Sequence, residues 1–342
     1  MAAEADLPRH GGDLAFARAH YGEPADGWLD LSTGVNPTPY PAPPLAAAAL
    51  ARLPDRDALR DLVATARRAY GAPAQATLIA TPGSDTAIRL LPVAAPPGPV
   101  VVVAPTYAGH VDAWRDAGRV VVDAATIDAI PDEATIAVVV NPNNPDGQLH
   151  HPDALAQAAH RLGERGGLLV VDEAFGDPTP DASLMPYLAG LPAVVLRSFG
   201  KFYGLAGLRL GFVAGSPPPL DRLAALLGEW PVSSAAIAIG RAALADAAWR
   251  DAARRRLRTQ HARLSALLAR RGLDPIGGTD LFVLVDTPTA ADIHRELARR
   301  GIWTRVFVEQ PAWLRIGLPG GDAGFTRLDG ALEEIIAPAA VR

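Results

Sequence analysis

Seven short runs of aliphatic and β-branched residues recur along the sequence, and most are separated by segments with helical spacing. Such runs are typical of strands buried on both faces, and their alternation with helices indicates a mostly parallel sheet between helical layers. We therefore predict an α/β fold whose large domain holds a mostly parallel seven-stranded sheet. The expected strands are Leu78–Thr81, Val100–Ala104, Arg119–Asp123, Ile136–Val140, Leu168–Val171, Ala193–Leu196 and Leu210–Ala214.

The pattern changes after about Leu220, where two long helical stretches precede a smaller α+β unit with strands near 281–285, 302–304 and 313–316. Residues 1–45 are rich in proline and glycine and lack a clear period, although Trp28 and Leu29 indicate that this arm packs against something. We predict three parts: an N-terminal arm, 1–45, that belongs to the small domain and covers the site as a lid, a large domain, 46–248, and a small C-terminal α+β domain, 249–342.

Composition excludes several kinds of function. The chain of 342 residues has no cysteine, which rules out disulfides, thiolate catalysis and cysteine-ligated zinc, and its net charge of -5 argues against a nucleic-acid partner. The first six residues include Glu4 and Asp6 where a signal peptide needs positive charge, and prolines interrupt the most apolar stretch, Leu90–Val103. We expect a cytoplasmic protein without a membrane partner.

The sequence contains a single lysine, Lys201, among 32 basic residues. Unlike a guanidinium group, a lysine amine can lose its proton and attack a carbonyl to form a Schiff base. A surface lysine is the alternative. Lys201 follows an expected strand, but Phe202 stands where a P-loop needs Ser or Thr. No GxGxxG follows the first strand and HExxH is absent, so we expect neither a dinucleotide site nor a metal site; the pair His150-His151 is typical of a loop.

A pyridoxal-phosphate site requires an amine, a carboxylate for the ring nitrogen, an aromatic ring and a phosphate cup. Asp172 ends a buried strand, where a carboxylate is costly to bury without a cation. The turn Gly83-Ser84-Asp85 offers backbone N–H groups at a helix start, and Tyr107 supplies a ring. Taken singly, these could be an ion-paired aspartate, an ordinary helix cap and a core tyrosine. Together with Lys201 they predict pyridoxal 5'-phosphate as the cofactor.

Three motifs carry a family resemblance over nearly the whole chain: Ser198-x-x-Lys201 followed by Gly207-x-Arg209, Asn141-Pro-Asn-Asn144-Pro-Asp-Gly147, and Asp172-Glu-Ala174. With them the chain resembles the fold-type I pyridoxal-phosphate enzymes, in the branch of histidinol-phosphate aminotransferase and L-threonine-O-3-phosphate decarboxylase. The resemblance implies the fold-type I architecture and a homodimer.

The resemblance also assigns roles. Lys201 would form the Schiff base, Asp172 would pair with the ring nitrogen, and Tyr107 and Ala174 would lie against the two ring faces. Asn144 would bind the phenolic oxygen and lie next to the substrate. The phosphate end would be held by Gly83, Ser84, Asp85, Ser198 and Arg209. Arg315 would bind the substrate's α-carboxylate, a task suited to its planar fork, although alone it could be a surface arginine.

Two features favour the decarboxylase. His10-Gly11-Gly12 and the run from Asp30 to Pro37 resemble the cobalamin-pathway enzymes, so we expect His10, Gly11 and Asn36 near the substrate. Phe175 replaces the tyrosine usual in aminotransferases. There are two departures from the family pattern: Asp146 stands for a usual threonine, and Leu53 stands for a tyrosine that often reaches the neighbouring subunit. The second leaves open which groups cross the subunit interface.

The implied function is decarboxylation of L-threonine O-3-phosphate, a small phosphorylated amino acid, to (R)-1-aminopropan-2-yl phosphate and carbon dioxide in cobalamin biosynthesis. An aminotransferase acting on histidinol phosphate or a related amino acid with 2-oxoglutarate is the alternative. A non-catalytic binding protein on the same fold is a third hypothesis.

Overall fold

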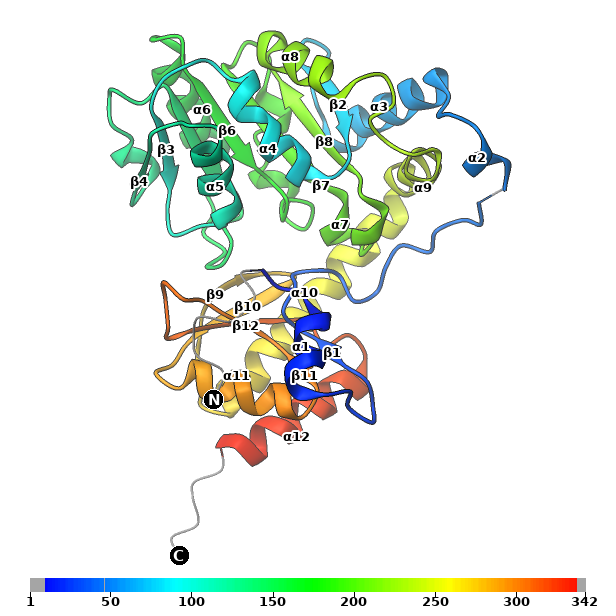
Figure 1. Cartoon of the computed structure of the whole chain (residues 1–342), viewed down its shortest axis with the longest axis vertical. Coiled ribbons are helices and arrows are strands. Elements are labelled where there is room, and N and C mark those ends of the chain that lie inside the picture. The colour runs from blue at the N-terminus through cyan, green and yellow to red at the C-terminus, as the bar shows by residue number, and fades with distance from the viewer. Residues whose placement is uncertain (1–9, 46, 337–342) are drawn as a thin grey trace, which may run out of the picture. The chain divides into compact units, whose positions relative to one another are not determined.

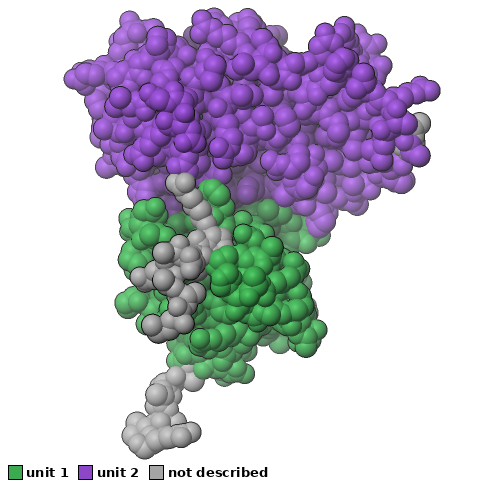
Figure 2. Space-filling model, viewed as in Figure 1, with its two compact units in different colours: residues 1–38, 253–342 green, residues 39–252 purple. Residues whose placement is uncertain are grey.

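The computed structural model describes residues 10–45 and 47–336, which fall into two compact units (Figure 2). The small unit comprises residues up to 38 together with those from 253 onward, and the large unit comprises residues 39–252. Residues 1–9, which include the acidic start, residue 46, and residues 337–342 lie outside the described residues. Residues 10–38 of the N-terminal arm therefore belong to the same unit as the C-terminal part of the chain, whereas residues 39–45 belong to the large unit.

The large unit is built on a seven-stranded sheet with the order β2-β8-β7-β6-β5-β3-β4 (Figure 1). Only β8 runs antiparallel to its neighbours, so the predicted mostly parallel sheet is confirmed. The strands are β2 (Thr77–Thr81), β3 (Val100–Val103), β4 (Val121–Ala124), β5 (Ile136–Val140), β6 (Leu168–Asp172), β7 (Ala193–Ser198) and β8 (Gly211–Gly215). Each lies within a few residues of its expected position.

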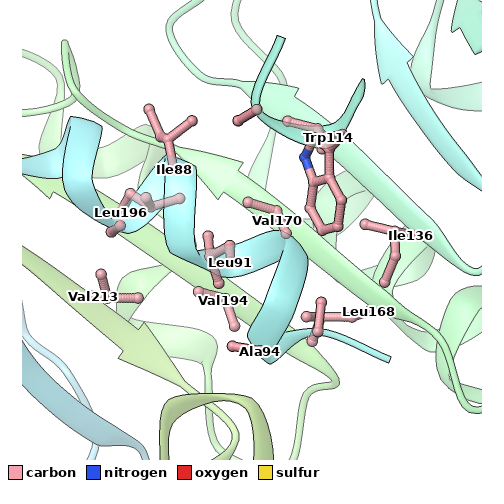
Figure 3. Packing of buried hydrophobic residues seen from close by; sticks show 14 of the residues in the cluster. Ile88, Leu91, Ala94, Trp114, Ile136, Leu168, Val170, Val194, Leu196 and Val213 are labelled. Atoms are coloured by element: carbon pink, nitrogen blue, oxygen red, sulfur yellow. The ribbon is translucent and has the colours of Figure 1, made fainter. Parts of the chain in front are cut away.

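The large unit also contains helices, most of which pack against this sheet and bury its apolar side chains. They are α2 (Ala48–Ala51), α3 (Arg56–Tyr70), α4 (Ser84–Ala94), α5 (Ala108–Asp116), α6 (Pro152–Gly163), α7 (Phe199–Phe202), α8 (Pro217–Leu227) and α9 (Ser234–Ala245). In Figure 3, Leu91 of α4 lies over Val170 and Val194 of the sheet, with Trp114 of α5 in the same cluster. All four are at most 1% exposed, so this cluster is the core that fixes the strand ends.

The small unit holds a four-stranded antiparallel sheet with the order β12-β13-β10-β9. Its strands are β9 (Pro275–Thr279), β10 (Phe282–Asp286), β12 (Arg305–Val306) and β13 (Trp313–Gly317), and its helices include α11 (Ala290–Arg299) and α12 (Asp322–Ile336). The long helix α10 (Ala247–Arg270) begins in the large unit and ends in the small one. The sequence predicted this α+β character but not β9 or β12.

The N-terminal arm packs within the small unit as a helix and a strand, although its sequence shows no clear period. Helix α1 (Leu14–Tyr21) begins where Asp13 accepts the N–H of Phe16. Strand β1 (Leu29–Asp30) pairs in parallel with β11 (Ile302–Trp303), and the N–H of Leu31 donates to the carbonyl of Trp303 at 2.7 Å. The indication from Trp28 and Leu29 that the arm packs agrees with this arrangement.

Within the part of the chain that the structure describes, no helix combines the length and apolarity needed to cross a membrane. Nor, among the same residues, do three histidine, aspartate or glutamate side chains come together as metal ligands would.

Candidate active site

The polar residues singled out in the first two thirds of the sequence lie where strands of the large sheet end. Asp172 is the last residue of β6 and Ser198 the last of β7, while Gly83 and Tyr107 follow β2 and β3. Because these strands are parallel, their carboxyl ends meet at one edge of the sheet, the usual ligand-binding edge of such folds.

Asp172 is buried, with 3% of its surface exposed, and both carboxylate oxygens have partners. Oδ1 accepts the N–H of Ala174 at 2.9 Å, and Oδ2 lies 2.9 Å from Nε2 of His110 on α5. When Asp172 is ionised, Nε2 of His110 donates this hydrogen bond. His110 is itself 1% exposed. Sequence reasoning missed His110, although it lies one helical turn after Tyr107 and so shares its helix face.

Lys201 lies on the short helix α7, which follows β7 directly. Its Nζ lies 5.4 Å from the centroid of the Phe175 ring. Phe175 is buried and begins the loop just beyond Ala174. The residue that replaces the aminotransferase tyrosine therefore borders the lysine amine with an apolar ring face.

The start of α4 and the residue Arg209 form a compact turn that could hold an anion. Gly83 has a φ of 82°, which disfavours other residues, and a Cβ there would lie 2.8 Å from Nη2 of Arg209. A Cβ at Gly211 would lie 2.6 Å from the backbone nitrogen of Ser84. The guanidinium of Arg209 is thus placed over the first turn of a helix, where N–H groups and the helix dipole favour negative charge. Asp85 turns toward Arg89, with 3.3 Å between Oδ2 and Nε.

Tyr107 is half-buried at the start of α5, and its ring meets that of His110 edge to face with centroids 6.1 Å apart. Burial, together with the nearby carboxylates of Asp85 and Asp172, raises the pKa of Tyr107 to about 12. Its hydroxyl therefore keeps its proton across the physiological range, and it offers the site a neutral ring.

The Asn141–Gly147 loop follows β5 and is held by side-chain amides. The backbone nitrogen of Asn141 donates to the carbonyl of Asp172 at 2.8 Å, which joins this loop to the end of β6. Asp146 accepts from Nδ2 of Asn143 at 2.8 Å and from the N–H of Gln148 at 2.9 Å. Asp146, which stands where the family usually has a threonine, thus stabilises the turn. Asn144 lies half-buried in the same loop.

A buried ion network lies on the opposite face of β6 and β7 from Asp172 and Ser198. Nη1 of Arg197 lies 2.8 Å from Oε2 of Glu173, and Nη2 lies 2.8 Å from Oδ1 of Asp177. The carboxylates hold the pKa of Arg197 above its ordinary value despite its burial. Because Glu173 and Arg197 each neighbour a site residue in sequence, the pair ties together the two strand ends that carry Asp172 and Ser198.

The remaining predicted residues, His10, Gly11, Asn36 and Arg315, lie in the small unit. Arg315 on β13 is 6% exposed, and its Nη2 donates to the carbonyl of Ser32 at 2.6 Å. Oγ of Ser32 accepts the N–H of Gly12 at 2.7 Å, so the arm residues beside His10 and Gly11 reach the same serine as Arg315. Asn36 is buried and accepts the N–H of Thr38 at 2.9 Å.

A second arginine, Arg305, accompanies Arg315. The two are paired residues of the neighbouring strands β12 and β13. Burial and the positive charge of Arg305 lower the pKa of Arg315 to about 9, while Asp30 opposes the shift. Because a guanidinium group does not deprotonate in proteins, the lowered pKa reflects the electrostatic cost of burying Arg315 beside the half-buried cation of Arg305. Sequence reasoning missed Arg305, which only the strand pairing connects with Arg315.

The predicted cofactor residues thus lie in the large unit, and the predicted substrate residues lie in the small unit, apart from Asn144, which lies in the large one.

Known proteins resemble this chain along nearly its whole length. A threonine-phosphate decarboxylase of Pseudomonas aeruginosa is 44% identical over 332 residues, covering 96% of this chain and 98% of that protein. A threonine-phosphate decarboxylase of Sinorhizobium sp is 42% identical, covering 94% and 97%. The solved structure of histidinol-phosphate aminotransferase from Sinorhizobium meliloti, in complex with pyridoxal-5'-phosphate, matches with a TM-score of 0.80 at 24% identity, covering 97% and 96%.

These likenesses confirm the fold-type I architecture and the resemblance noted in the sequence. Residues 28–328 match the family described as aminotransferase class I and II. The chain belongs to the aminotransferase class I and II family.

Proposed function

We propose that this protein is a pyridoxal-phosphate-dependent carboxy-lyase that converts L-threonine O-3-phosphate to (R)-1-aminopropan-2-yl phosphate and carbon dioxide in cobalamin biosynthesis. The observation that carries the proposal is the identity of 44% and 42%, over nearly the whole chain, to two threonine-phosphate decarboxylases. The geometry of the two units supports it.

The chemistry of the large unit fits the cofactor. A ring cation would neutralise the buried Asp172, and the α4 turn with Arg209 and Ser198 would receive a phosphate. The amine of Lys201 would hold the aldehyde, with Tyr107 and Ala174 against the ring faces and Asn144 at the phenolic oxygen. Bound pyridoxal phosphate supplies an electron-withdrawing ring that accepts the electron pair released when the bond between Cα and the carboxylate breaks.

The protein's own residues would decide which bond breaks. Arg315 would hold the substrate carboxylate by its planar fork and so set the direction of that group. Asp172, supported by His110, would keep a proton on the ring nitrogen. Nζ of Lys201 would deliver a proton to Cα after carbon dioxide leaves.

The paired arginines of the small unit support a substrate with two anionic groups. Arg315 is buried and Arg305 is half-buried on the paired strands β13 and β12, and the charge of Arg305 lowers the pKa of Arg315. Two anions on one small molecule would offset this cost better than one. L-Threonine O-3-phosphate carries a carboxylate and a phosphate. We assign the carboxylate to Arg315 and the phosphate to the side of Arg305, with His10, Gly11 and Asn36 nearby, and we propose that the arm closes over the bound substrate.

An aminotransferase is the second candidate, because the family contains such enzymes and histidinol-phosphate aminotransferase shares the fold. Phe175 weighs against it, since it leaves no hydroxyl at the position where those enzymes usually have one.

The deciding experiment incubates the purified protein with L-threonine O-3-phosphate, and separately with histidinol phosphate plus 2-oxoglutarate. We expect carbon dioxide from the first mixture and no glutamate from the second. Lys201→Ala is the control for catalysis, and Lys201→Arg keeps the positive charge without a nucleophilic amine. Glutamate formation without carbon dioxide would establish the aminotransferase, and a protein that binds no cofactor would revive the non-catalytic alternative.

We further propose a homodimer in the cytoplasm. Around α2, Leu50 and Leu53 are 72% and 69% exposed, and Trp230 is 49% exposed. We propose that these side chains belong to an apolar surface that a second copy covers, because contiguous apolar patches mark such interfaces. Light scattering of the wild type and of Leu50→Ser with Leu53→Ser tests the dimer, and cell fractionation tests the location.

A further inference from the structure

The short helix that carries Lys201 presents an aromatic face on its other side. Phe199, Phe202 and Tyr203 have the spacing of one helix face, and all three are fully buried. The rings of Phe199 and Tyr203 stack with centroids 4.1 Å apart and 8° between their planes. The orientation of α7, and with it that of the lysine, therefore depends on what holds these rings.

Two residues from distant parts of the sequence hold them. The ring of Trp249 stacks on Tyr203 with centroids 5.7 Å apart and 11° between planes, and meets Phe202 edge to face at 5.6 Å. Tyr40 meets Trp249 edge to face at 5.2 Å, and its backbone N–H donates to the carbonyl of Tyr203 at 2.9 Å. Stacked and edge-to-face pairs stabilise beyond the area they bury.

The two holding residues lie at the two ends of the large unit, near its first residue, Pro39, and its last, Ala252. Trp249 is fixed in the first turn of α10 because its backbone N–H donates to Oδ1 of Asp246 at 2.9 Å. The chain thus enters and leaves the large unit beside the helix of the catalytic lysine.

We propose that Tyr40 and Trp249 are positioning residues for Lys201, acting through the stacked rings of α7. The importance of Lys201 rests on the proposed function, but the contacts that fix α7 do not. The other side of α7 is also constrained, since a Cβ at Gly200 would lie 2.9 Å from Cα of Ala206. Removing the ring of Trp249 therefore loosens one side only, and α7 can tilt away from Ala206.

Amide hydrogen exchange of the full-length protein tests the proposal. In Trp249→Ala we expect exchange of residues 199–204 to accelerate about tenfold, because two ring contacts are lost. Trp249→Phe keeps a ring and should give a smaller change. Tyr40→Phe keeps both the ring and the backbone bond and should match the wild type, whereas Tyr40→Ala should accelerate exchange.

The single lysine permits a second readout that needs neither substrate nor turnover. After removal of the cofactor, acetic anhydride labels Lys201 and the chain terminus, which mass spectrometry separates. We expect the Lys201 labelling rate to change at least about threefold in Trp249→Ala, which corresponds to half a unit in the pKa of an amine.

Two controls separate positioning from general loss of stability. Leu62→Ala removes a fully buried side chain from α3, and Val122→Ala trims an exposed side chain of β4. Both should leave local exchange and labelling at α7 unchanged. If Trp249→Ala behaves like Leu62→Ala in both readouts, the proposal is overturned even if the enzyme decarboxylates threonine phosphate. If α7 loosens as expected but no carbon dioxide forms, the positioning stands and the proposed function fails.

Discussion

Nε2 of His110 lies 2.9 Å from Oδ2 of Asp172, and neither side chain reaches solvent to more than a few per cent. A hydrogen bond to a buried carboxylate fixes its orientation. The residue that we assign to the cofactor's ring nitrogen is thus itself held in place by a neighbouring helix.

Replacing this histidine should weaken the cofactor site. In His110→Phe we expect the dissociation constant for pyridoxal phosphate to rise about tenfold to a hundredfold, because a charge-assisted hydrogen bond is lost. His110→Asn keeps a donor and should lose less. Absorbance titration measures the affinity, and Arg115→Ala, at an exposed position of the same helix, is the control. Unchanged affinity in His110→Phe would contradict the assignment of Asp172.

A methyl group at Gly83 should disturb the phosphate end of the site. Gly83→Ala meets a φ of 82° and places a Cβ 2.8 Å from Nη2 of Arg209. Gly228→Ala meets a similar φ of 75° but no heavy atom within 4 Å. Both should lose stability through backbone strain, by about 1 kcal/mol. Only Gly83→Ala should also weaken binding of pyridoxal phosphate. Equal affinities of the two variants for pyridoxal phosphate would contradict the assignment of the α4 turn to the phosphate end of the site.

The buried network of Arg197 should matter far more for stability than an exposed ion pair. In Arg197→Met we expect a loss of about 3–5 kcal/mol in the free energy of unfolding, because Glu173 and Asp177 remain buried without their cation. Arg56→Ala removes an exposed pair with Glu229 and should cost less than about 1 kcal/mol. Urea unfolding of both variants tests the contrast, and similar midpoints would contradict it.

The small unit should lose stability in mild acid because of His294. This side chain is 2% exposed, and Nδ1 lies 2.9 Å from Oγ1 of Thr304. Burial, and then the charges of Arg305 and Arg295, lower its pKa to about 4. Between this value and the ordinary value of about 6.5, the unfolded chain binds more protons than the folded one, so stability falls as the pH decreases.

We expect this group to contribute a loss of about 3 kcal/mol between pH 7 and pH 4. The difference between wild type and His294→Gln in urea unfolding across that range measures it. His20→Gln, at an exposed histidine of α1, should leave the pH dependence unchanged. If His294→Gln shows the same slope as the wild type, the buried histidine is not its source.

Arg305 should contribute to the preference for L-threonine O-3-phosphate over unphosphorylated L-threonine. In Arg305→Met we expect kcat/KM for L-threonine O-3-phosphate to fall about tenfold to a hundredfold, because a charged hydrogen bond is lost, with any activity on L-threonine little changed. The affinity for pyridoxal phosphate should stay the same, and Arg299→Met, at an exposed position of α11, is the control. An equal loss for both amino acids would assign Arg305 a structural role.

The sheet and the position of Asp172 at a strand end could be predicted because apolar runs report burial directly. Helix α1 could not, because its apolar stripe is short and it is stabilised by packing of Leu14 and Phe16 against Trp303. His110 could have been found by its helical spacing from Tyr107. The links between Arg197 and Asp177 and between Arg305 and Arg315 could not, since they depend on which strands become neighbours and in what register.

The roles of the site residues stay predictions, but their placement has physical reasons. Arg315 could equally have been a surface arginine in the sequence, and it is buried in the structure because β13 is the strand between β10 and β12. Leu53, in contrast, is exposed, and its neighbours within this chain give no reason for its identity.

The reversed direction of β8 has a consequence for how the site is assembled during synthesis. A parallel strand would need a long crossover after β7 and would reach the site only with its carboxyl end. The antiparallel β8 instead follows β7 directly and begins at the site, with Ser198 opposite Gly211. Lys201 and Arg209 therefore lie in the same connection between two antiparallel strands. Because they are close in sequence, they can come together early in folding, before the distant strands of the sheet pair. We expect a residue inserted into this connection to shift the amine of Lys201 relative to the guanidinium of Arg209, because both lie between the paired ends of β7 and β8.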